Sequence, residues 1–490
     1  MDLFLGIDLG ASSLKACLVD GQGRQVKDAR VEIATAHPAN GFSEQDPADW
    51  RLAMARACMA LAGGQNGLVD VKAVSFSGGA HIAVLCDGEA RPLRPAILWS
   101  DQRAAPQAAQ LAEKGRVEKI AGNRPNATWT LPQLLWLQTH ETHVIDDTRM
   151  LFFAKDWLRY QLTEEHSSDM GEAVGAMLAD KTGQWSPDLQ KLSGLAQTAF
   201  PPLLGEGAPA GAVSEKAGAF FGLPVGTPVY QGAIDTSMEW LCAAPQQPDM
   251  ASLKLASAGV LAFTTQSPHR APPVSYYPHI IDGWHYHAAG MSDCMGAIDW
   301  LRENMTPHLT AEAFAKAAAD APLGAQGLLF YPYLSGARAP FWDASLRAEL
   351  TGLTRGHDAA AIARAAYEGV GHVLLAIWHD MTAQLGHAPD RLHVLGGGSQ
   401  LGFFCQMLAD MLGVRLTLGP HSDSAFAAAL LAATAQGAFD TLPDAAQAAY
   451  GPENKAGQKG SQNTVQQFVP DKQNHALYAD AHDKFMARHN

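Results

Sequence analysis

Residues 229–240 read VYQGAIDTSMEW and place the carboxylate of Asp235 where a short apolar run passes into a helical segment. A carboxylate at such a strand-to-helix turn can accept a proton from a substrate hydroxyl, while the N–H groups of the turn face an anion. Asp235 can equally serve only as the cap of the helix, which is a common position for aspartate. The stretch lies near the middle of the sequence, where two halves of the chain could meet over a cleft.

The composition indicates a large globular protein with two domains. At 490 residues the chain is too long for one ordinary core, and its 47% hydrophobic and 17% charged residues are globular values. A formal net charge of −14 argues against nucleic acid or an anionic membrane as partner, because both require a basic surface. The sequence leaves the oligomeric state open, with a homodimer as the commonest default.

Several features favour a cytoplasmic protein. The first ten residues, MDLFLGIDLG, lack the basic and long apolar regions of a signal peptide. The segment from Ala425 to Ala435 is the most lipid-like, but it is too short to span a bilayer, and we predict a buried helix there. No short paired spacing that would indicate zinc binding or a disulfide framework occurs among the six cysteines: Cys17, Cys58, Cys86, Cys242, Cys294 and Cys405.

The N-terminus predicts a hairpin that could bind phosphate. Leu3–Ile7 and Leu14–Val19 read as two strands, and the turn 8–13 between them carries a carboxylate, a glycine and two hydroxyls. Glycine lets the backbone approach a phosphate, hydroxyls and N–H groups donate to its oxygens, and Asp8 could hold a hydrated Mg²⁺. The alternative is an ordinary glycine turn.

Two further strands are predicted to end in polar clusters. Residues 71–77 lead into Ala80 and His81, and residues 96–99 lead into a segment with Asp101 and Arg103. Hydrogen-bonding groups at strand ends suit a polyhydroxylated ligand. The alternatives are a structural role for His81 and a surface ion pair for Asp101 and Arg103.

The second half of the chain repeats the strand-turn-strand pattern. Residues 244–249 read as a connection, so we predict one domain over 1–243 and another over 244–490. Residues 253–263 then form a second hairpin around Ser257, which suggests a duplicated architecture. Residues 392–395 predict a strand that is followed by three glycines, Ser399 and a helix, a pattern that can cradle a nucleotide.

Taken together, these segments resemble the FGGY carbohydrate kinase family of the actin-like ATPase superfamily, and within it most resemble the xylulokinases. The resemblance runs from Gly6 to about Leu431. It is carried, in this order, by the motifs GIDLGASSLKA, SEQDPADW, GGAHIA, PAILWSDQR, WTLPQLLWLQTH, KDWLRYQLT, QGAIDT, YPYLSGARAP, GLTRG with ARAAYEGV, and LGGGS.

The resemblance implies an α/β fold of two actin-like (ribonuclease H-like) lobes, each a mixed sheet flanked by helices, with an interlobe cleft for ATP, Mg²⁺ and a sugar. By position, Asp235 would be the general base and Asp8 the carboxylate that faces Mg²⁺ and phosphate. The implied ATP-binding residues are Gly10, Ser12, Ser13, Lys15, Ser257, Gly259, Gly397, Gly398 and Ser399. The implied sugar-binding residues are Ala80, His81, Asp101, Arg103, Asp235 and Thr236.

The chain departs from the family pattern at six positions. Ala11, Ala256 and Ala258 remove hydroxyls or add methyls near the phosphates, which would weaken ATP binding. Ala80 takes the place of the family's methionine beside the sugar, Thr236 stands where xylulokinases often have asparagine, and Gln133 replaces a common lysine. A lost pocket contact changes discrimination by about 1–3 kcal/mol. The resemblance therefore implies a sugar kinase with D-xylulose as first substrate. Ribulose, gluconate and glycerol are rivals, and a non-catalytic nucleotide sensor is the alternative from another class.

Overall fold

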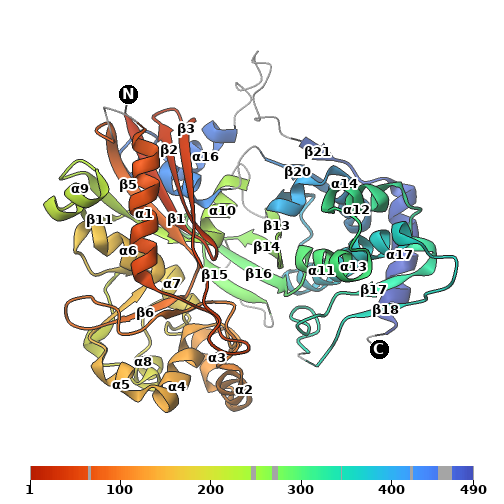
Figure 1. Ribbon diagram of the computed structural model, residues 1–490, viewed down its shortest axis with the longest axis horizontal. Coiled ribbons are helices and arrows are strands. Elements are labelled where there is room, and N and C mark those ends of the chain that lie inside the picture. The colour runs from red at the N-terminus through yellow and green to blue at the C-terminus, as the bar shows by residue number, and fades with distance from the viewer. Residues whose placement is uncertain are drawn as a thin grey trace. The chain divides into compact units, whose positions relative to one another are not determined.

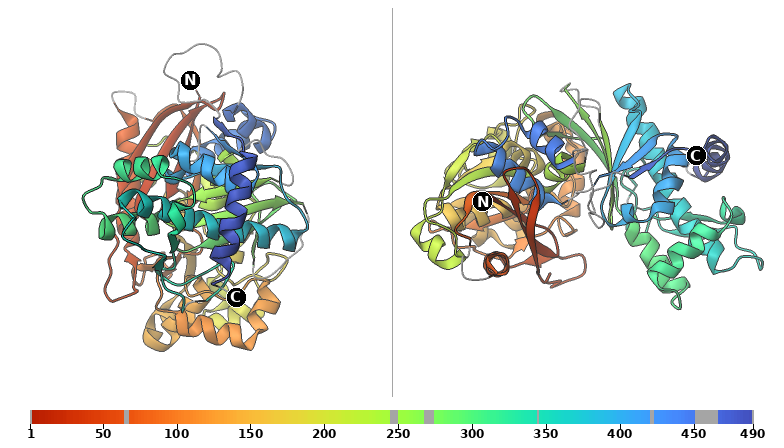
Figure 2. Two further views of the ribbon diagram at one scale, coloured as in Figure 1. Left: turned by 90° about the vertical axis from the view of Figure 1, so that its right-hand side faces the viewer. Right: turned by 90° about the horizontal axis from the view of Figure 1, so that it is seen from above.

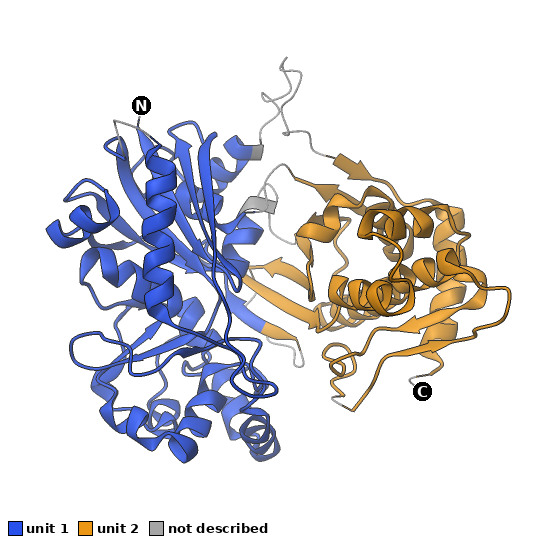
Figure 3. Cartoon of the chain, viewed as in Figure 1, with its two compact units in different colours: residues 1–246, 276–284, 421–453 blue, residues 247–275, 285–420, 454–490 orange. Residues whose placement is uncertain are grey.

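The computed structural model describes residues 2–63, 68–243, 250–266, 274–343, 345–419, 423–450 and 466–488. The chain forms two compact units, and neither is continuous in sequence (Figure 3). Unit 1 comprises residues 1–246, 276–284 and 421–453, and unit 2 comprises 247–275, 285–420 and 454–490. This differs from the single boundary predicted near residue 243, because two later segments return to unit 1. The predicted connection at 244–249 lies outside the described residues.

Unit 1 contains a six-stranded mixed sheet in the order β11-β12-β5-β1-β2-β3 (Figure 1). Strands β1, β2 and β3 form an antiparallel meander, β5 and β12 run parallel to β1, and β11 is antiparallel to β12. The strands are β1 (Leu3–Leu9), β2 (Ser13–Asp20), β3 (Gln25–Glu32), β5 (Val71–Gly78), β11 (Pro209–Ala212) and β12 (Pro228–Ile234).

Helices cover both faces of the sheet because its central strands, β1, β2, β5 and β12, are buried on both sides. Along β1, Leu5, Ile7 and Leu9 belong to the core that includes helices α1, α6 and α9. Phe4 points to the opposite face, into a core built on α15 and α16, as the two-residue period of a strand requires. These helices are α1 (Pro47–Ala62), α6 (Ala154–Thr163), α9 (Glu215–Phe221), α10 (Asp235–Ala243), α15 (Ser424–Ala435) and α16 (Leu442–Tyr450). The predicted buried helix at 425–435 is confirmed.

A smaller region of unit 1 is inserted after β5 and has its own core. Its helices are α2 (Ala105–Lys114), α3 (Arg116–Ala121), α4 (Thr130–His140), α5 (Thr142–Asp147), α7 (Met170–Gly175), α8 (Pro187–Ser193) and the 3-10 turn Gln197–Ala199. Short strand pairs attach it: β4 (Glu44–Gln45) with β7 (Ala96–Ile97), β6 (Ala83–Cys86) with β8 (Met150–Phe153), and β9 (Ser168–Asp169) with β10 (Leu203–Leu204).

A seven-stranded sheet built mainly from unit 2 repeats the topology of the unit 1 sheet and adds one strand, β15. Its order is β15-β16-β14-β13-β19-β20-β21. Strands β13, β14 and β16 form an antiparallel meander, β19 and β20 run parallel to β13, and β21 is antiparallel to β20. The duplicated architecture suggested by the two hairpins is therefore confirmed. The strands are β13 (Ala251–Leu255), β14 (Gly259–Thr265), β15 (Ser275–Pro278), β16 (His285–Met291), β19 (Arg391–Leu395), β20 (Arg415–Leu418) and β21 (Gln466–Phe468).

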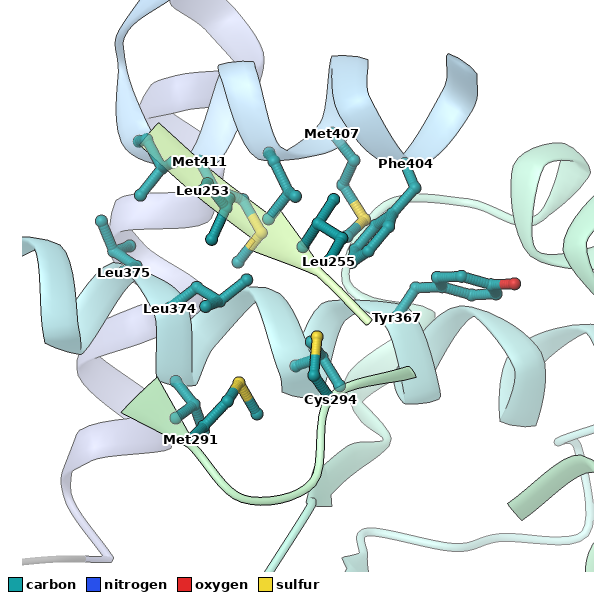
Figure 4. Packing of buried hydrophobic residues seen from close by; sticks show 14 of the residues in the cluster. Leu253, Leu255, Met291, Cys294, Tyr367, Leu374, Leu375, Phe404, Met407 and Met411 are labelled. Carbon is teal, nitrogen blue, oxygen red and sulfur yellow. The ribbon is translucent and has the colours of Figure 1, made fainter. Parts of the chain in front are cut away.

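The core of unit 2 lies where the central strands pack on long helices. Leu253 and Leu255 of β13 lie against Leu374 of α13 and Met407 of α14, with Tyr367 closing one end (Figure 4). The remaining elements are α11 (Met295–Met305), α12 (Ala311–Asp320), β17 (Leu329–Tyr331), β18 (Glu349–Thr351), α13 (Ala359–Leu385), α14 (Gly402–Leu412), α17 (Lys472–Met486) and the 3-10 turns Ala325–Gly327 and Gly397–Gln400.

Helix α13 is long and apolar enough to cross a membrane by length and composition alone. In the structure, however, 89% of its apolar stretch is buried inside the protein. Among the described residues it is the one helix that passes this test. Its position is that of a core helix of unit 2.

Gly6 allows helix α15 to lie directly on strand β1. A Cβ added at Gly6 would lie 1.9 Å from the carbonyl oxygen of Ala425 and 2.3 Å from the backbone nitrogen of Ala429. Both neighbours are backbone atoms of a helix, so neither can move aside alone. The close approach of these two elements therefore requires glycine at this position.

We expect Gly6→Ala to destabilise unit 1 by about 3 kcal/mol or more, because overpacking against rigid backbone is relieved only by moving the helix. The urea midpoint of unfolding measures this. Gly21→Ala is the control, since a Cβ at this exposed glycine would meet nothing within 4 Å. Equal midpoints for the two variants would contradict the proposed packing constraint.

Helix α17 is the helix that leads to the C-terminus (Figure 2). It packs on the rest of unit 2 through a group of stacked rings. The His372 ring of α13 stacks on His482 of α17 at 5.5 Å and on Phe485 at 5.1 Å between centroids. Burial lowers the pKa of His372 to about 3, with His482 adding to the effect. Burial and His379 lower the pKa of His482 to about 4. Both imidazoles are therefore neutral in the folded protein near neutral pH.

This arrangement predicts acid sensitivity of unit 2. The unfolded chain binds protons on these histidines below about pH 6.5 while the folded chain does not, so stability falls as pH decreases from about 6.5 towards 4. Each histidine contributes up to about 1.4 kcal/mol per pH unit. Urea unfolding across this range should give a shallower pH dependence for His372→Leu. The matched control is His308→Leu at an exposed position, and an unchanged slope in His372→Leu would refute the assignment.

Candidate functional site

The candidate functional side chains of unit 1 lie at the sheet edge formed by the carboxyl ends of β1, β5 and β12. Asp8 of β1 lies beside Ser77 of β5, and Gly78 of β5 lies beside Ile234 of β12. Asp235 follows Ile234 directly and is the first residue of α10. Parallel pairing therefore brings two carboxylates 227 positions apart in sequence to one sheet edge.

Asp235 is held by its neighbour and remains partly exposed. Its Oδ1 accepts the backbone N–H of Thr236 at 2.6 Å and the Thr236 hydroxyl at 3.2 Å. Within the described residues, no hydrogen bond to Oδ2 is formed. The carboxylate is thus oriented through one oxygen, and the other oxygen is available to a ligand.

Asp8 belongs to β1 and not to the turn where the sequence placed it, because its strand pairs with Lys15 of β2. Its side chain is 6% exposed, and Oδ1 has no hydrogen-bond partner among the described residues. Burial raises the pKa of Asp8 to about 7, and the nearby charges of Asp235 and Asp423 add to the rise. The charges of Asp235 and Asp423 therefore both act on Asp8, and a cation bound at Asp8 would relieve this repulsion.

Lys15 contacts a residue that sequence reasoning missed. Its Nζ donates to Asp423 Oδ2 at 2.8 Å, across 408 positions of sequence. Although burial opposes it, the charge of Asp423 raises the pKa of Lys15. Asp423 also caps α15 by accepting the N–H of Ala425. The sequence alone could have indicated that Asp423 caps a helix, but not that Asp423 pairs with Lys15.

The tip of the first hairpin is exposed, and hydrogen bonds from a later segment hold it in place. The Gly10 N–H donates to the Ser13 carbonyl at 3.0 Å, and Ser12 at the tip is exposed while Ser13 is buried. Gln45 Nε2 donates to the Ala11 carbonyl at 2.7 Å, and Trp50 Nε1 donates to Gln45 Oε1 at 2.9 Å. Part of the SEQDPADW motif thus holds the hairpin tip in place.

Ala80 and His81 form the turn that follows β5 at the same sheet edge. Ala80 is partly exposed, whereas His81 is 8% exposed and has a left-handed backbone with φ of 54°. The ring centroid of His81 lies 5.8 Å from that of Trp129. The turn therefore follows the strand that lies between those leading to Asp8 and Asp235.

Asp101 and Arg103 form a buried ion pair, so the surface-pair alternative is wrong. They are 1% and 7% exposed, and Arg103 Nη2 donates to Asp101 Oδ2 at 2.8 Å. Arg103 also contacts Glu44 at 2.7 Å and lies over the ring of Phe42. These groups satisfy one another and link the inserted region to the segment that carries Phe42 and Glu44. Gln133, another family position, is buried and donates to the Leu98 and Thr128 carbonyls.

Unit 2 carries the second hairpin at the equivalent edge of its sheet. Ser257 is exposed at the tip between β13 and β14, and Gly259 is buried where β14 begins. The Ser257 carbonyl accepts the Cys294 N–H at 2.7 Å, which fixes the tip on the start of α11. The Ala256 N–H donates to the Ala258 carbonyl at 3.1 Å, and this hydrogen bond closes the turn.

The glycine run lies beside this second hairpin. Leu395 of β19 pairs with Lys254 of β13, so residues 396–399 emerge at the same edge. Gly397 is exposed, whereas Gly398 and Ser399 are buried. The Ser399 hydroxyl donates to the Gly396 carbonyl at 2.6 Å. Its hydroxyl therefore shapes the turn, and Gly397 offers the accessible backbone.

Each unit thus presents a hairpin tip and a parallel-strand edge, and family comparison agrees with this duplicated plan. The chain matches the N-terminal domain of the FGGY family of carbohydrate kinases over residues 3–242 and the C-terminal domain over 256–436. The chain belongs to the FGGY family of carbohydrate kinases. Kinases of this family use ATP, and the sequence resemblance and the actin-like two-lobe fold class are both confirmed.

Individual relatives cover almost the whole FGGY kinase. The xylulose kinase of Escherichia coli (strain K12) is 32% identical over 452 residues, which cover 90% of this chain and 92% of that protein. The glycerol kinase of Paracidovorax citrulli is 28% identical, and the match covers 90% of this chain and 92% of that protein. A crystal structure described as a xyloylose kinase from Brucella ovis superposes with a TM-score of 0.89, at 27% identity over 99% of this chain and 98% of that one.

No group of three or more His, Cys, Asp or Glu side chains that could hold a metal ion is found in the part of this FGGY kinase that the structure describes. Mg²⁺ usually binds proteins through one or two carboxylates together with water and substrate phosphates. A single buried carboxylate such as Asp8 therefore fits the donor set that Mg²⁺ requires.

We expect Gln45→Met to weaken the hairpin tip, because it leaves the Ala11 carbonyl and the Trp50 N–H without their partner. The cost should be about 1–3 kcal/mol, measured as a lower urea midpoint. Gln25→Met is the control, since the amide of Gln25 makes its bond to Asp28 at an exposed position. Equal midpoints in the two variants would show that Gln45 does not support the hairpin.

Proposed function

We propose that this FGGY kinase transfers the γ-phosphoryl group of ATP to the terminal hydroxyl of D-xylulose, with Asp235 as general base. The observation that carries the proposal is the position of Asp235 at the sheet edge, next to the parallel strands that carry Asp8 and the Ala80–His81 turn. The sequence relationship to proteins named xylulose kinases supports the choice of sugar.

Asp235 has the features of a base for in-line transfer. Phosphoryl transfer requires positioning of the hydroxyl and the γ-phosphate, charge neutralisation and a carboxylate near the nucleophile. Thr236 fixes one oxygen of Asp235, so Oδ2 can accept the hydroxyl proton as the oxygen attacks phosphorus. The proton moves to Asp235, the new P–O bond forms, and ADP departs with the electrons of the broken bond.

Asp8 is the residue that would hold Mg²⁺. Its orphaned oxygen and the nearby charges of Asp235 and Asp423 create a surplus of negative charge that a cation relieves. When bound, Mg²⁺ would neutralise charge on the phosphate oxygens. Lys15, held by Asp423, places a positive charge that acts on Asp8.

The two hairpins and the glycine run would bind ATP. In unit 1 the exposed Ser12 would present its hydroxyl, with Gly10 and Ser13 forming the rest of the turn. In unit 2 the exposed Ser257 would do so, followed by the buried Gly259. Gly397 and Gly398 would lie on the adenosine side, with Ser399 shaping their turn. Nests of N–H groups are common anion sites in proteins.

Ala80, His81 and Thr236 would set the choice of sugar, with Asp101 and Arg103 maintaining the surrounding region. The small side chain of Ala80 leaves room where the family carries methionine. Glycerol is the principal rival, because a glycerol kinase matches the chain over a similar length. Ribulose and gluconate are tested alongside it. We infer a cytoplasmic enzyme that acts on small molecules, in keeping with its acidic surface.

The decisive variant is Asp235→Asn. The amide oxygen of asparagine can still accept the Thr236 N–H, so this change removes the base and keeps that hydrogen bond. We expect kcat to fall by about 10²–10⁴-fold while the thermal midpoint stays unchanged. The measurement is coupled-assay ADP release with ATP and Mg²⁺ across a panel of ketopentoses, polyols and sugar acids.

Asp46→Asn is the matched control, because Asp46 caps α1 at another turn-to-helix junction. It should leave kcat unchanged. If Asp235→Asn also retains full turnover, Asp235 is not the general base and only orients the start of α10. Preference for another sugar would keep the mechanism and replace the substrate. ATP hydrolysis that no sugar stimulates would favour the nucleotide sensor.

A further inference from the structure

The backbone of His81 is hydrogen-bonded on both sides by two buried side chains. Its N–H donates to Glu172 Oε2 of α7 at 2.7 Å, and its carbonyl accepts the Thr130 hydroxyl of α4 at 2.7 Å. Glu172 and Thr130 are both 0% exposed. A non-glycine residue with positive φ is strained by about 1–3 kcal/mol, and surrounding contacts must maintain it.

The two helices that carry these side chains are joined to each other. The Leu131 N–H of α4 donates to the Ala176 carbonyl at the end of α7, at 3.0 Å. The three hydrogen bonds connect the turn, α4 and α7 in a closed triangle. Because each corner is fixed by the other two, the turn cannot shift without breaking a buried bond.

Helix α7 also defines where the ring of His81 lies. Glu172 and Gly175 are three residues apart and therefore share one face of the helix. A Cβ built at Gly175 would lie 3.3 Å from His81 Cδ2. The ring thus rests on the helix at Gly175, while its backbone is bound by Glu172.

A buried charge network anchors α7 to the strand that leads to Asp235. Asp169, the cap of α7, accepts the Glu172 N–H at 2.9 Å and pairs with Lys155. Gln231 of β12 donates from Nε2 to Asp169 at 3.1 Å. Gln231 precedes Asp235 by only four residues on one continuous segment. The same rigid network therefore fixes both the His81 turn and the strand of Asp235.

We propose that Glu172 and Thr130 are positioning residues that set sugar affinity by holding the His81 turn in its left-handed conformation. The proposal rests on the proposed sugar-kinase function. Neither residue needs to touch the sugar. Neither bonds to the hairpin residues assigned to ATP, so the effect of losing them falls on the sugar and not on the nucleotide.

The test measures KM for sugar and KM for ATP in Glu172→Met and Thr130→Val. Each variant removes one partner of the His81 backbone and keeps similar volume. We expect the sugar KM to rise about tenfold and the ATP KM to stay within about twofold. Glu172→Gln should restore the wild-type sugar KM, because its amide oxygen can still accept the His81 N–H. Thr130→Val keeps the test available if Glu172→Met fails to fold.

Thr148→Val is the matched control. Thr148 is 1% exposed and donates its hydroxyl to the Val144 carbonyl at 2.6 Å, away from the turn. It should lower stability without changing either KM. A sugar KM within twofold of wild type in the soluble test variants, or an equal rise in both KM values, would overturn the positioning role while leaving the kinase function intact. Absence of sugar-dependent turnover in wild type would instead overturn the proposed function and this role together.

Discussion

The contact between helix α15 and strand β1 is the constraint on which much of unit 1 depends. Only glycine at position 6 lets the helix backbone come this close. Two residues further along the same face of β1 lies Asp8, and the helix begins beside it with its cap, Asp423. The packing that closes one face of the sheet therefore also supplies the Lys15 partner and part of the negative charge around Asp8.

Local sequence patterns predicted the elements of this site well. The first hairpin, the helix at Asp235 and the strand before the glycine run all occur where alternation and turn residues placed them. The duplicated plan also followed from two similar hairpins. The strand boundary was missed at Asp8, because pairing with Lys15 extends β1 into what reads locally as a polar turn. Tertiary pairing overrode local composition there.

Contacts between distant segments could not be predicted in the same way. Asp423 and Lys15 are 408 positions apart, and Asp423 alone reads only as a helix cap. Arg103 reads as a surface residue, yet Glu44, Asp101 and Phe42 together make its burial favourable. The sequence alone indicates no role for Glu172, because that role depends on a hydrogen bond from a backbone N–H that lies 91 positions away. The roles of Asp423, Arg103 and Glu172 therefore depend on which residues they contact in the folded protein, and residue type alone does not reveal these contacts.

The discontinuity of unit 1 has a consequence for synthesis of the protein. The sheet strands β1 to β12 leave the ribosome long before residues 424–435, which cover one of their faces. Until then Phe4, Val19 and Ala233 lack the apolar layer that buries them in the finished protein. Nascent chains with exposed apolar surface are prone to aggregate and to recruit chaperones. The N-terminal half of this enzyme is thus made first but completed nearly last, after most of unit 2 has already been translated.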